Sequence, residues 1–212
     1  MRISTQNLEN LPNVSGLKRL LQSLAVLDAI LAPEWEYRHY SFNAHWRKGE
    51  TMGSMRDGQG NEIFALFNSR GAFLKGFMHD APMANRKIPS DYFYRDLPSD
   101  FEEYSREPAF SPDDVTFCIW RHLDQPAWRC SKINSPIFDD ADGSAGLLSI
   151  LDALPETYRK WASAYYECQV PLGAIEAVYR HQILTDELIA AINPRQNTTI
   201  LKRDIAEIGY PR

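Results

Sequence analysis

A series of strand-like segments joined by very short connections constrains the fold more than any other feature of the sequence. Residues 37–46 alternate between apolar and polar side chains, which is typical of a strand with one buried face. Residues 50–57, 63–67 and 72–79 continue the series, with glycine-containing turns between them. A parallel crossover needs about a dozen residues or more, so these connections predict an antiparallel meander.

The alternation in the first strand predicts which of its side chains are buried. Neighbouring residues of a strand point to opposite faces. We therefore expect the apolar set to face the core and the polar set to face outward or into a cleft. The apolar set is Tyr40, Phe42, Ala44 and Trp46, and the polar set is His39, Ser41, Asn43 and His45.

Helical patterns lie on either side of the predicted sheet. Leucines recur at three- and four-residue spacing over residues 14–31, and Pro33 ends this pattern. In the last third of the chain we expect Pro155 to begin a helix, Thr185 to cap another and Gly209 to end the last. The predicted fold class is α+β, with an antiparallel meander sheet, an N-terminal helix and a helical C-terminal third.

Residues 80–114 form a polar segment that is rich in aromatic residues and punctuated by proline. Within it, Ser99 and Glu102 have the spacing of a capping box, in which each side chain satisfies an amide of the first helical turn. This spacing predicts a helix that begins at Ser99 and ends before Pro108. Strand character returns between residues 115 and 130.

No repeat, low-complexity tract or obvious linker divides the chain. We therefore expect a single α+β domain over residues 1–212, with a helical subdomain at 144–212 as the alternative. The only plausible boundary is at residues 131–143. Apolar residues make up 44% of the 212 residues, which is enough for a sizeable core without disulfides or metals.

The formal net charge of −5 is mildly acidic, so the sequence lacks the excess of positive charge that is typical of proteins that bind a phosphate backbone. We therefore expect no nucleic-acid partner, while a basic protein partner fits the charge. The three cysteines are scattered and do not form a Cys-x-x-Cys pair, which is typical of a reducing compartment. No signal-peptide pattern or membrane-spanning run is present, so a cytoplasmic location without membrane attachment is expected.

The sequence carries no strong catalytic or metal-binding motif. The five histidines lack a His-Glu-x-x-His arrangement, and the acidic run that begins at Asp139 fails the calcium-loop pattern at Phe138 and Ser149. Around Ser144 the residues resemble a nucleophile elbow only weakly, because Asp142 stands in place of its first glycine. We expect no bound metal and no cofactor.

The sequence feature that most strongly suggests a function is a group of aromatic residues that lie near loops. They are Trp35, Tyr37, Tyr92, Phe93, Tyr94, Tyr104 and Tyr166. Tyrosine and tryptophan suit protein interfaces, but packing of a long loop over the sheet explains these rings equally well. The predicted partner surface combines rings with acidic groups: Tyr92, Tyr94, Asp100, Glu102, Glu103 and Tyr104.

Several stretches resemble an uncharacterised family of bacterial proteins of about 200 residues. They are Tyr40-Ser41-Phe42-Asn43, Ser54-Met55-Arg56-Asp57-Gly58, Lys75-Gly76-Phe77, Thr116-Phe117-Cys118-Ile119-Trp120 and Ile208-Gly209-Tyr210-Pro211. Such proteins are similar to the immunity proteins of bacterial toxin systems, which block a toxin by surface contact. The resemblance implies no particular functional residue.

Two functions remain open from the sequence. The first is a non-catalytic protein-binding module of a bacterial cytosol, of which an immunity protein that blocks a toxin is one form. The alternative is an enzyme of unknown class with a site on the polar sheet face near His39, His45 and His79.

Overall fold

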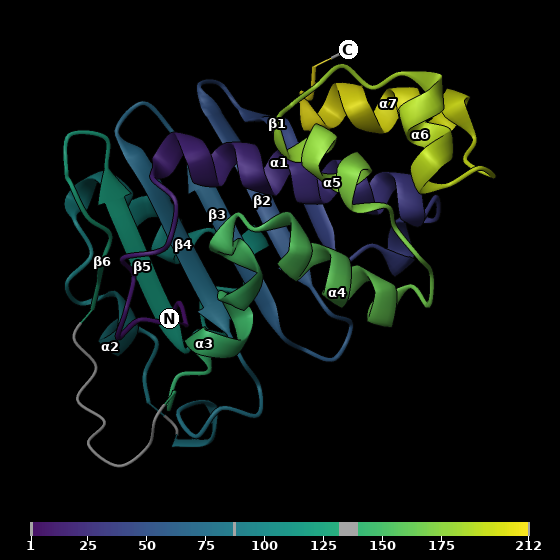
Figure 1. Cartoon of the computed structure of the whole chain (residues 1–212). Coiled ribbons are helices and arrows are strands. Elements are labelled where there is room, and N and C mark those ends of the chain that lie inside the picture. The colour runs from purple at the N-terminus through teal and green to yellow at the C-terminus, as the bar shows by residue number, and fades with distance from the viewer. Residues whose placement is uncertain (1, 87, 132–139, 212) are drawn as a thin grey trace.

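The computed structural model describes residues 2–86, 88–131 and 140–211 (Figure 1). Within these residues a six-stranded antiparallel sheet has the strand order β1-β2-β3-β4-β5-β6. The strands are β1 (Tyr40–Arg47), β2 (Glu50–Arg56), β3 (Glu62–Phe67), β4 (Gly71–Phe77), β5 (Phe117–His122) and β6 (Arg129–Cys130). Strands that are consecutive in the chain are neighbours in the sheet, so the predicted meander is confirmed.

The helices also confirm the predicted α+β class. The N-terminal helix α1 spans Val14–Leu31, which are the predicted bounds. The short helix α2 (Asp91–Tyr94) lies in the aromatic segment. The C-terminal helices are α3 (Ser144–Leu147), α4 (Pro155–Tyr165), α5 (Leu172–Tyr179), α6 (Asp186–Ile192) and α7 (Thr198–Ile208). Most of the predicted boundary at 131–143, and Phe138 and Asp139 of the acidic run, lie outside the described residues.

Local signals in the C-terminal third act as predicted. Pro155 occupies the first turn of α4, where its missing amide costs nothing. The Thr185 hydroxyl accepts a hydrogen bond from the Leu188 amide at 3.2 Å and caps α6. Gly209 ends α7 with a φ of 68°, a left-handed conformation that glycine adopts without strain. The acidic loop before α3 has a structural role, because Asp140 accepts the Ala145 amide at 2.7 Å.

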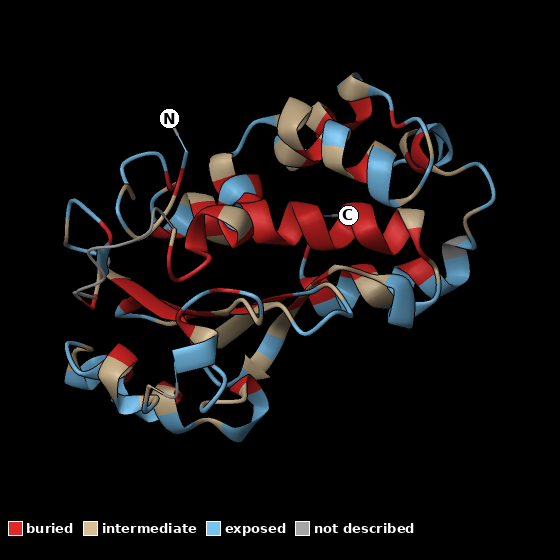
Figure 2. Cartoon of the chain, turned by 90° about the horizontal axis from the view of Figure 1, so that it is seen from below, coloured by how far each residue is buried: buried red, intermediate tan, exposed pale blue. Residues whose placement is uncertain are grey.

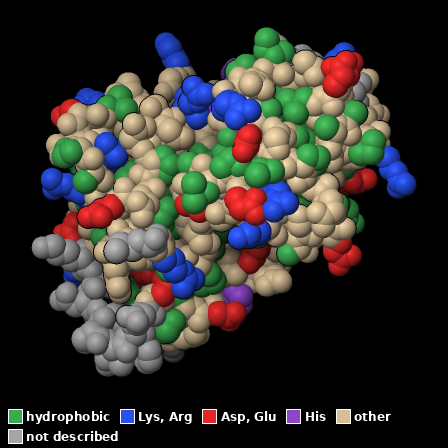
Figure 3. All heavy atoms as spheres, viewed as in Figure 1, with side chains coloured by type: hydrophobic (Ala, Val, Ile, Leu, Met, Phe, Trp, Pro, Cys, Tyr) green, Lys and Arg blue, Asp and Glu red, His purple; other side chains and the backbone are tan. Residues whose placement is uncertain are grey.

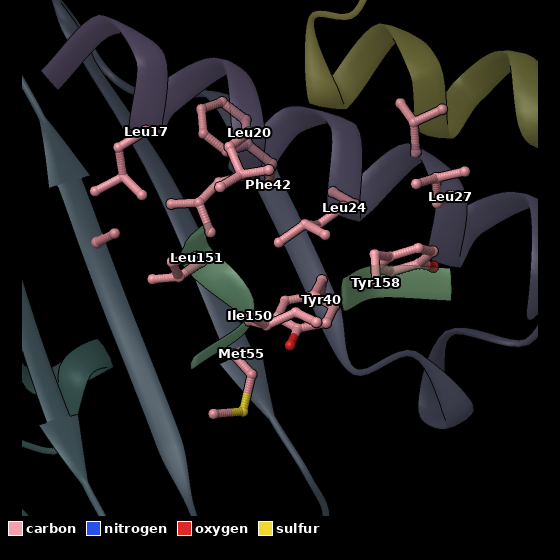
Figure 4. Close-up of a cluster of buried hydrophobic side chains, with 14 of the residues drawn as sticks. Leu17, Leu20, Leu24, Leu27, Tyr40, Phe42, Met55, Ile150, Leu151 and Tyr158 are labelled. Carbon is pink, nitrogen blue, oxygen red and sulfur yellow. The ribbon is translucent and has the colours of Figure 1, made fainter. Parts of the chain in front are cut away.

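The fold has three layers (Figure 2). One face of the sheet carries α1, with α7 beside it in contact with both α1 and β1, and α5 packs against α1. A single hydrophobic cluster includes residues of α1, the sheet and the C-terminal helices, among them Leu24, Phe42 and Tyr158 (Figure 4). Segments between residues 80 and 114 cover part of the opposite sheet face, where Phe101 and Phe110 are buried in a second cluster.

Helix α1 is buried on more than its leucine stripe, because the C-terminal helices cover its polar positions. The Gln22 amide donates to the Ile208 carbonyl at 3.1 Å, and the Ser23 hydroxyl donates to the Val178 carbonyl at 3.1 Å. Asp28, one turn further along, is also fully buried. These polar side chains connect α1 to helices that come from the other end of the chain.

The first strand confirms most of the predicted burial pattern. Tyr40 and Phe42 are buried against α1, and Ala44 packs against the same cluster. Of the predicted polar set, Ser41 forms a 2.7 Å hydrogen bond with the Ser54 hydroxyl, and His45 is exposed.

Trp46 contradicts the predicted pattern. Its ring stacks on Phe110, with ring centroids 5.9 Å apart, and packs against the cluster on the opposite sheet face. The pairing of β1 with β2 shifts register between Asn43 and Arg47. This irregularity interrupts the strict alternation on which the prediction for Trp46 depended.

The predicted helix at Ser99 forms, but with a different geometry. It is a 3₁₀ helix over Ser99–Arg106, and its end at Arg106 lies before Pro108 as predicted. The predicted capping box is wrong, because Pro98 occupies the cap position and no side chain caps the helix. Its buried residues Phe101 and Tyr104 face the sheet, so tertiary packing rather than capping determines its position.

A buried lysine fixes the aromatic segment to the sheet. The Lys75 side chain has no exposed surface, and its ammonium donates to Glu62 at 2.7 Å. It also donates to the Phe110 carbonyl at 2.6 Å and the Ser111 carbonyl at 2.9 Å. All three N–H groups are therefore satisfied, which a buried ammonium requires.

Candidate functional site

The three histidines of the alternative enzyme site have separate surroundings. His39 lies at the start of β1, whereas His45 is exposed near its other end. The backbone amide of His79 donates to Asn61 at 2.9 Å, and its ring lies 3.0 Å from the Asp80 carboxylate. Among the described residues, no group of three or more His, Cys, Asp and Glu side chains is arranged to hold a metal ion.

The tyrosines of the predicted partner surface turn toward the protein. Tyr104 is 2% exposed, and its hydroxyl accepts a 2.9 Å hydrogen bond from Asn68 and donates to Glu50. Tyr94 is half-buried and donates to the Pro112 carbonyl at 3.1 Å. Tyr92 is half-buried as well. The expectation that Tyr104 is a surface anchor is therefore wrong, because this ring holds the aromatic segment on the sheet.

The acidic residues of that predicted surface face solvent. Asp100 lies 3.4 Å from the Arg70 guanidinium and 3.2 Å from the His122 ring. Glu102 pairs with Arg106 at 2.7 Å, and Glu103 is exposed beside it. Nearby cations thus offset part of this negative charge, and no exposed ring accompanies it.

Trp35 and Tyr37 are the aromatic residues that are most exposed among those described. They are 62% and 60% exposed, and both lie in the short 3₁₀ helix η1 (Trp35–Tyr37) between α1 and β1. Single exposed apolar residues are ordinary, whereas exposed rings close together in the chain indicate a candidate interaction surface. We take this segment as the candidate site.

Arg38 ties the end of η1 to the preceding chain and to α7. Its guanidinium donates to the Ala32 carbonyl and the Pro33 carbonyl, each at 2.8 Å. It also donates to the Asp204 carboxylate of α7 at 2.7 Å. The Arg38 side chain is only 8% exposed, so this contact is largely shielded from water.

Asp28 holds the other side of the same segment. Its Oδ2 atom accepts the backbone amides of His39 at 2.9 Å and Tyr40 at 2.7 Å. Its Oδ1 atom accepts the Tyr158 hydroxyl of α4 at 2.9 Å. Burial nevertheless raises the pKa of Asp28 from 3.8 to about 7, so desolvation outweighs these three hydrogen bonds.

Aromatic rings enclose this junction on the helical side. The His39 ring lies with its centroid 4.8 Å from Trp161 and 5.3 Å from Tyr165, both in α4. Tyr40 and Tyr158 both pack against Trp161, with ring centroids 5.2 Å and 5.4 Å from it. Burial lowers the pKa of His39 to about 4, so the imidazole is neutral at physiological pH.

Two hollows flank Trp35. The first has a volume of about 190 Å³ and opens on the polar sheet face, where Glu36, Ser41, Ser54 and Arg56 line it. The second, of about 30 Å³, lies between Trp35 and α7 along the outer edge of β1. Its lining includes Asp204 and Glu207.

A larger hollow of about 890 Å³ lies at the opposite edge of the sheet, around β6. Trp120 and Trp128 line it, together with Arg121 and Arg129. Its mixed charges do not single out one class of ligand.

No protein-family model, no curated protein and no solved structure matches this chain. Within the described residues, none of the helices combines the length and the apolar character needed to cross a lipid bilayer. Acidic and basic side chains intermix on the face shown in Figure 3.

Sequence reasoning singled out Trp35 and Tyr37 as aromatic residues but missed the residues that position them. Asp28 stands alone within the apolar run Leu24-Ala25-Val26-Leu27-Asp28-Ala29-Ile30-Leu31. A carboxylate in such a run is a detectable signal, because burying it requires several hydrogen-bond donors. Nothing in the sequence identifies those donors.

Proposed function

We propose that the protein is a non-catalytic protein-binding module that uses the segment between α1 and β1 to contact its partner. We define the Trp35 surface as Trp35, Tyr37 and the exposed carboxylates of Glu34, Glu36 and Glu207. The observation that carries the proposal is that two exposed rings stand on a segment whose backbone is fixed from beneath by Asp28 and Arg38.

Fixed aromatic rings suit protein binding for energetic reasons. A tryptophan or tyrosine at the centre of an interface can contribute 2 kcal/mol or more in order-of-magnitude terms. The side chains and backbone that become ordered on binding oppose this gain. The Arg38 and Asp28 contacts already restrict the segment in the free protein, so less entropy is lost when the partner binds.

The charge around the rings favours a basic partner. Glu34 and Glu36 flank Trp35 in the chain, and Glu207 lines the hollow on its other side. The chain as a whole carries a formal charge of −5. Such rim charges speed the encounter with a partner of opposite sign and add less to the final affinity than the buried anchors do.

The narrower form of the proposal is an immunity protein that blocks a toxin in the bacterial cytosol. The acidic charge and the anchored rings support it, and several sequence stretches resemble an uncharacterised bacterial family that is itself similar to immunity proteins. Under this form we expect a toxin gene directly upstream of the gene for this protein. If the neighbouring genes encode no toxin, protein binding remains the proposal and the immunity function is withdrawn.

Site-specific photo-crosslinking tests the proposal in the cells that make the protein. Benzoylphenylalanine replaces Trp35 or Tyr37 in one pair of variants, and replaces Leu123 or Ile183 in a control pair. The controls are matched, because Leu123 and Ile183 are 59% and 61% exposed. We expect one discrete crosslinked protein, basic in charge, from positions 35 and 37 only. Equal crosslinking from all four positions, or none from 35 and 37, would contradict the proposal.

A further inference from the structure

We infer that the partner inserts an arginine side chain beside Trp35, into the recess between this ring and α7. The inference rests on the proposed protein-binding function and adds the chemistry of the group that is recognised. Such an arginine site requires three features at one place: an exposed aromatic face, a carboxylate that is not already paired with a cation, and a backbone edge that can accept hydrogen bonds.

The recess has an excess of negative charge. Asp204 and Glu207 of α7 line it, and among the described residues Arg38 is the one cation in its lining. Arg38 is already engaged by Asp204 at 2.7 Å and by two backbone carbonyls. The Glu207 carboxylate is exposed and has no ion pair among the described salt bridges, so it can accept a cation from a partner.

Trp35 supplies the aromatic face. Its ring is 62% exposed and borders both this recess and the adjoining hollow on the polar sheet face. A guanidinium stacks on tryptophan more favourably than on other rings, and its fork of N–H donors can engage a carboxylate at the same time. Lysine has a compact ammonium and cannot combine the two contacts equally well.

The sheet edge completes the recess. Because β1 is the terminal strand in the sheet order, its outer side faces away from β2. Tyr40, Ser41 and Phe42 of this strand line the recess. Backbone carbonyls on an edge strand are acceptors, and the planar guanidinium has five N–H donors to use. The volume of about 30 Å³ admits the tip of one side chain, while the rest of the chain lies on Trp35.

In the first experiment the free protein is titrated with the peptide acetyl-Gly-Arg-Gly-amide. Binding is measured from the indole N–H resonance of Trp35 in NMR spectra. We expect a saturable shift of this resonance that weakens at high salt. The same peptide with citrulline, which is an uncharged isostere of arginine, should give no saturable shift, and the lysine peptide should bind several-fold more weakly. Equal responses to the arginine and citrulline peptides would overturn the inference.

Two variants locate the carboxylate. Glu207→Gln should weaken binding of the arginine peptide by about threefold, as expected for one exposed ion pair. Glu103→Gln is the matched control, because Glu103 is also exposed but lies on the 3₁₀ helix Ser99–Arg106, whose buried residues pack on the opposite face of the sheet. Binding that falls equally in both variants would show a general charge effect and overturn the inference.

The outcome is separable from that of the proposed function. If crosslinking from position 35 captures a partner but the arginine peptide leaves the Trp35 resonance unshifted, the binding function holds and the arginine inference fails. If the peptide binds as expected but no partner is captured, the recess recognises arginine and the proposed cellular function fails.

Discussion

The hydroxyl of Tyr158 donates a hydrogen bond of 2.9 Å to Oδ1 of Asp28, which lies 130 residues earlier in the chain. The other oxygen of the same carboxylate accepts the amides of His39 and Tyr40. One buried group therefore joins α1, the edge strand β1 and α4. It fixes the start of β1, directly behind the segment that presents Trp35 and Tyr37.

Removing the Tyr158 hydroxyl should destabilise the fold. Tyr158→Phe keeps the ring but leaves a buried carboxylate oxygen without its donor, at a cost of about 1–3 kcal/mol. Tyr179→Phe is the matched control, because the buried Tyr179 hydroxyl has no hydrogen-bond partner among the described residues. Urea denaturation at pH 7 measures the unfolding free energy of both variants. Equal losses of unfolding free energy in the two variants would contradict the assigned role of Asp28.

Asp28→Asn should change how stability depends on pH. The folded-state pKa of Asp28 is raised to about 7, so its contribution is fully present below pH 3.8 and is lost as pH rises toward 7. Asparagine imitates the protonated acid and does not lose this contribution. The unfolding free energy of the variant, relative to the wild type, should therefore rise between pH 4 and 7 by on the order of 3 kcal/mol. A difference that stays constant over this range would contradict the prediction.

His39→Gln should produce the opposite trend. The folded-state pKa of His39 is lowered from 6.5 to about 4, so its contribution is present above pH 6.5 and is lost as pH falls to 4. Glutamine does not titrate, so the variant should gain stability relative to the wild type as the solution is acidified. In the wild type the Asp28 and His39 trends oppose each other between pH 4 and 6.5. Denaturation series on the two variants and the wild type test this cancellation.

Lys75→Met should loosen the aromatic segment. The substitution removes a buried ammonium and leaves Glu62 and two carbonyls without their donor, at a cost of about 3 kcal/mol. In the double variant Lys75→Met, Glu62→Gln the orphaned charge is absent, so part of the loss should return. Chemical denaturation of the single and double variants measures the difference. A double variant no more stable than Lys75→Met would show that the orphaned Glu62 charge is not the cause.

The parts of the fold that follow from local signals were predictable from the sequence. The leucine spacing defines α1 at 14–31, and short glycine-containing connections define the meander. Pro155 marks a helix start through its fixed backbone angle and missing amide, and Thr185 through its side-chain hydroxyl. Each of these signals acts within a few residues, so it needs no knowledge of the tertiary contacts.

The errors arise where tertiary contacts decide the outcome. Trp46 changes sheet face because the β1 register shifts, and periodicity alone cannot reveal a register shift. Tyr104 is buried and Trp35 is exposed, although the sequence places both rings beside polar residues near loops. The Tyr158 hydroxyl that donates to Asp28 lies 130 residues away in the chain. The role of Asp28 beneath the candidate site therefore cannot be predicted without knowing where α4 packs.

Quantitative affinity purification from the producing cells tests the central claim, that the Trp35 surface binds a protein partner, most directly. The baits are the wild type, Trp35→Ala and the control Leu123→Ala, all confirmed to be folded. An anchor worth about 2 kcal/mol should lower the affinity of Trp35→Ala for the partner roughly thirtyfold. We predict that one basic protein is recovered with the wild type and with Leu123→Ala but lost with Trp35→Ala. Recovery of the same partner by all three baits would contradict the account.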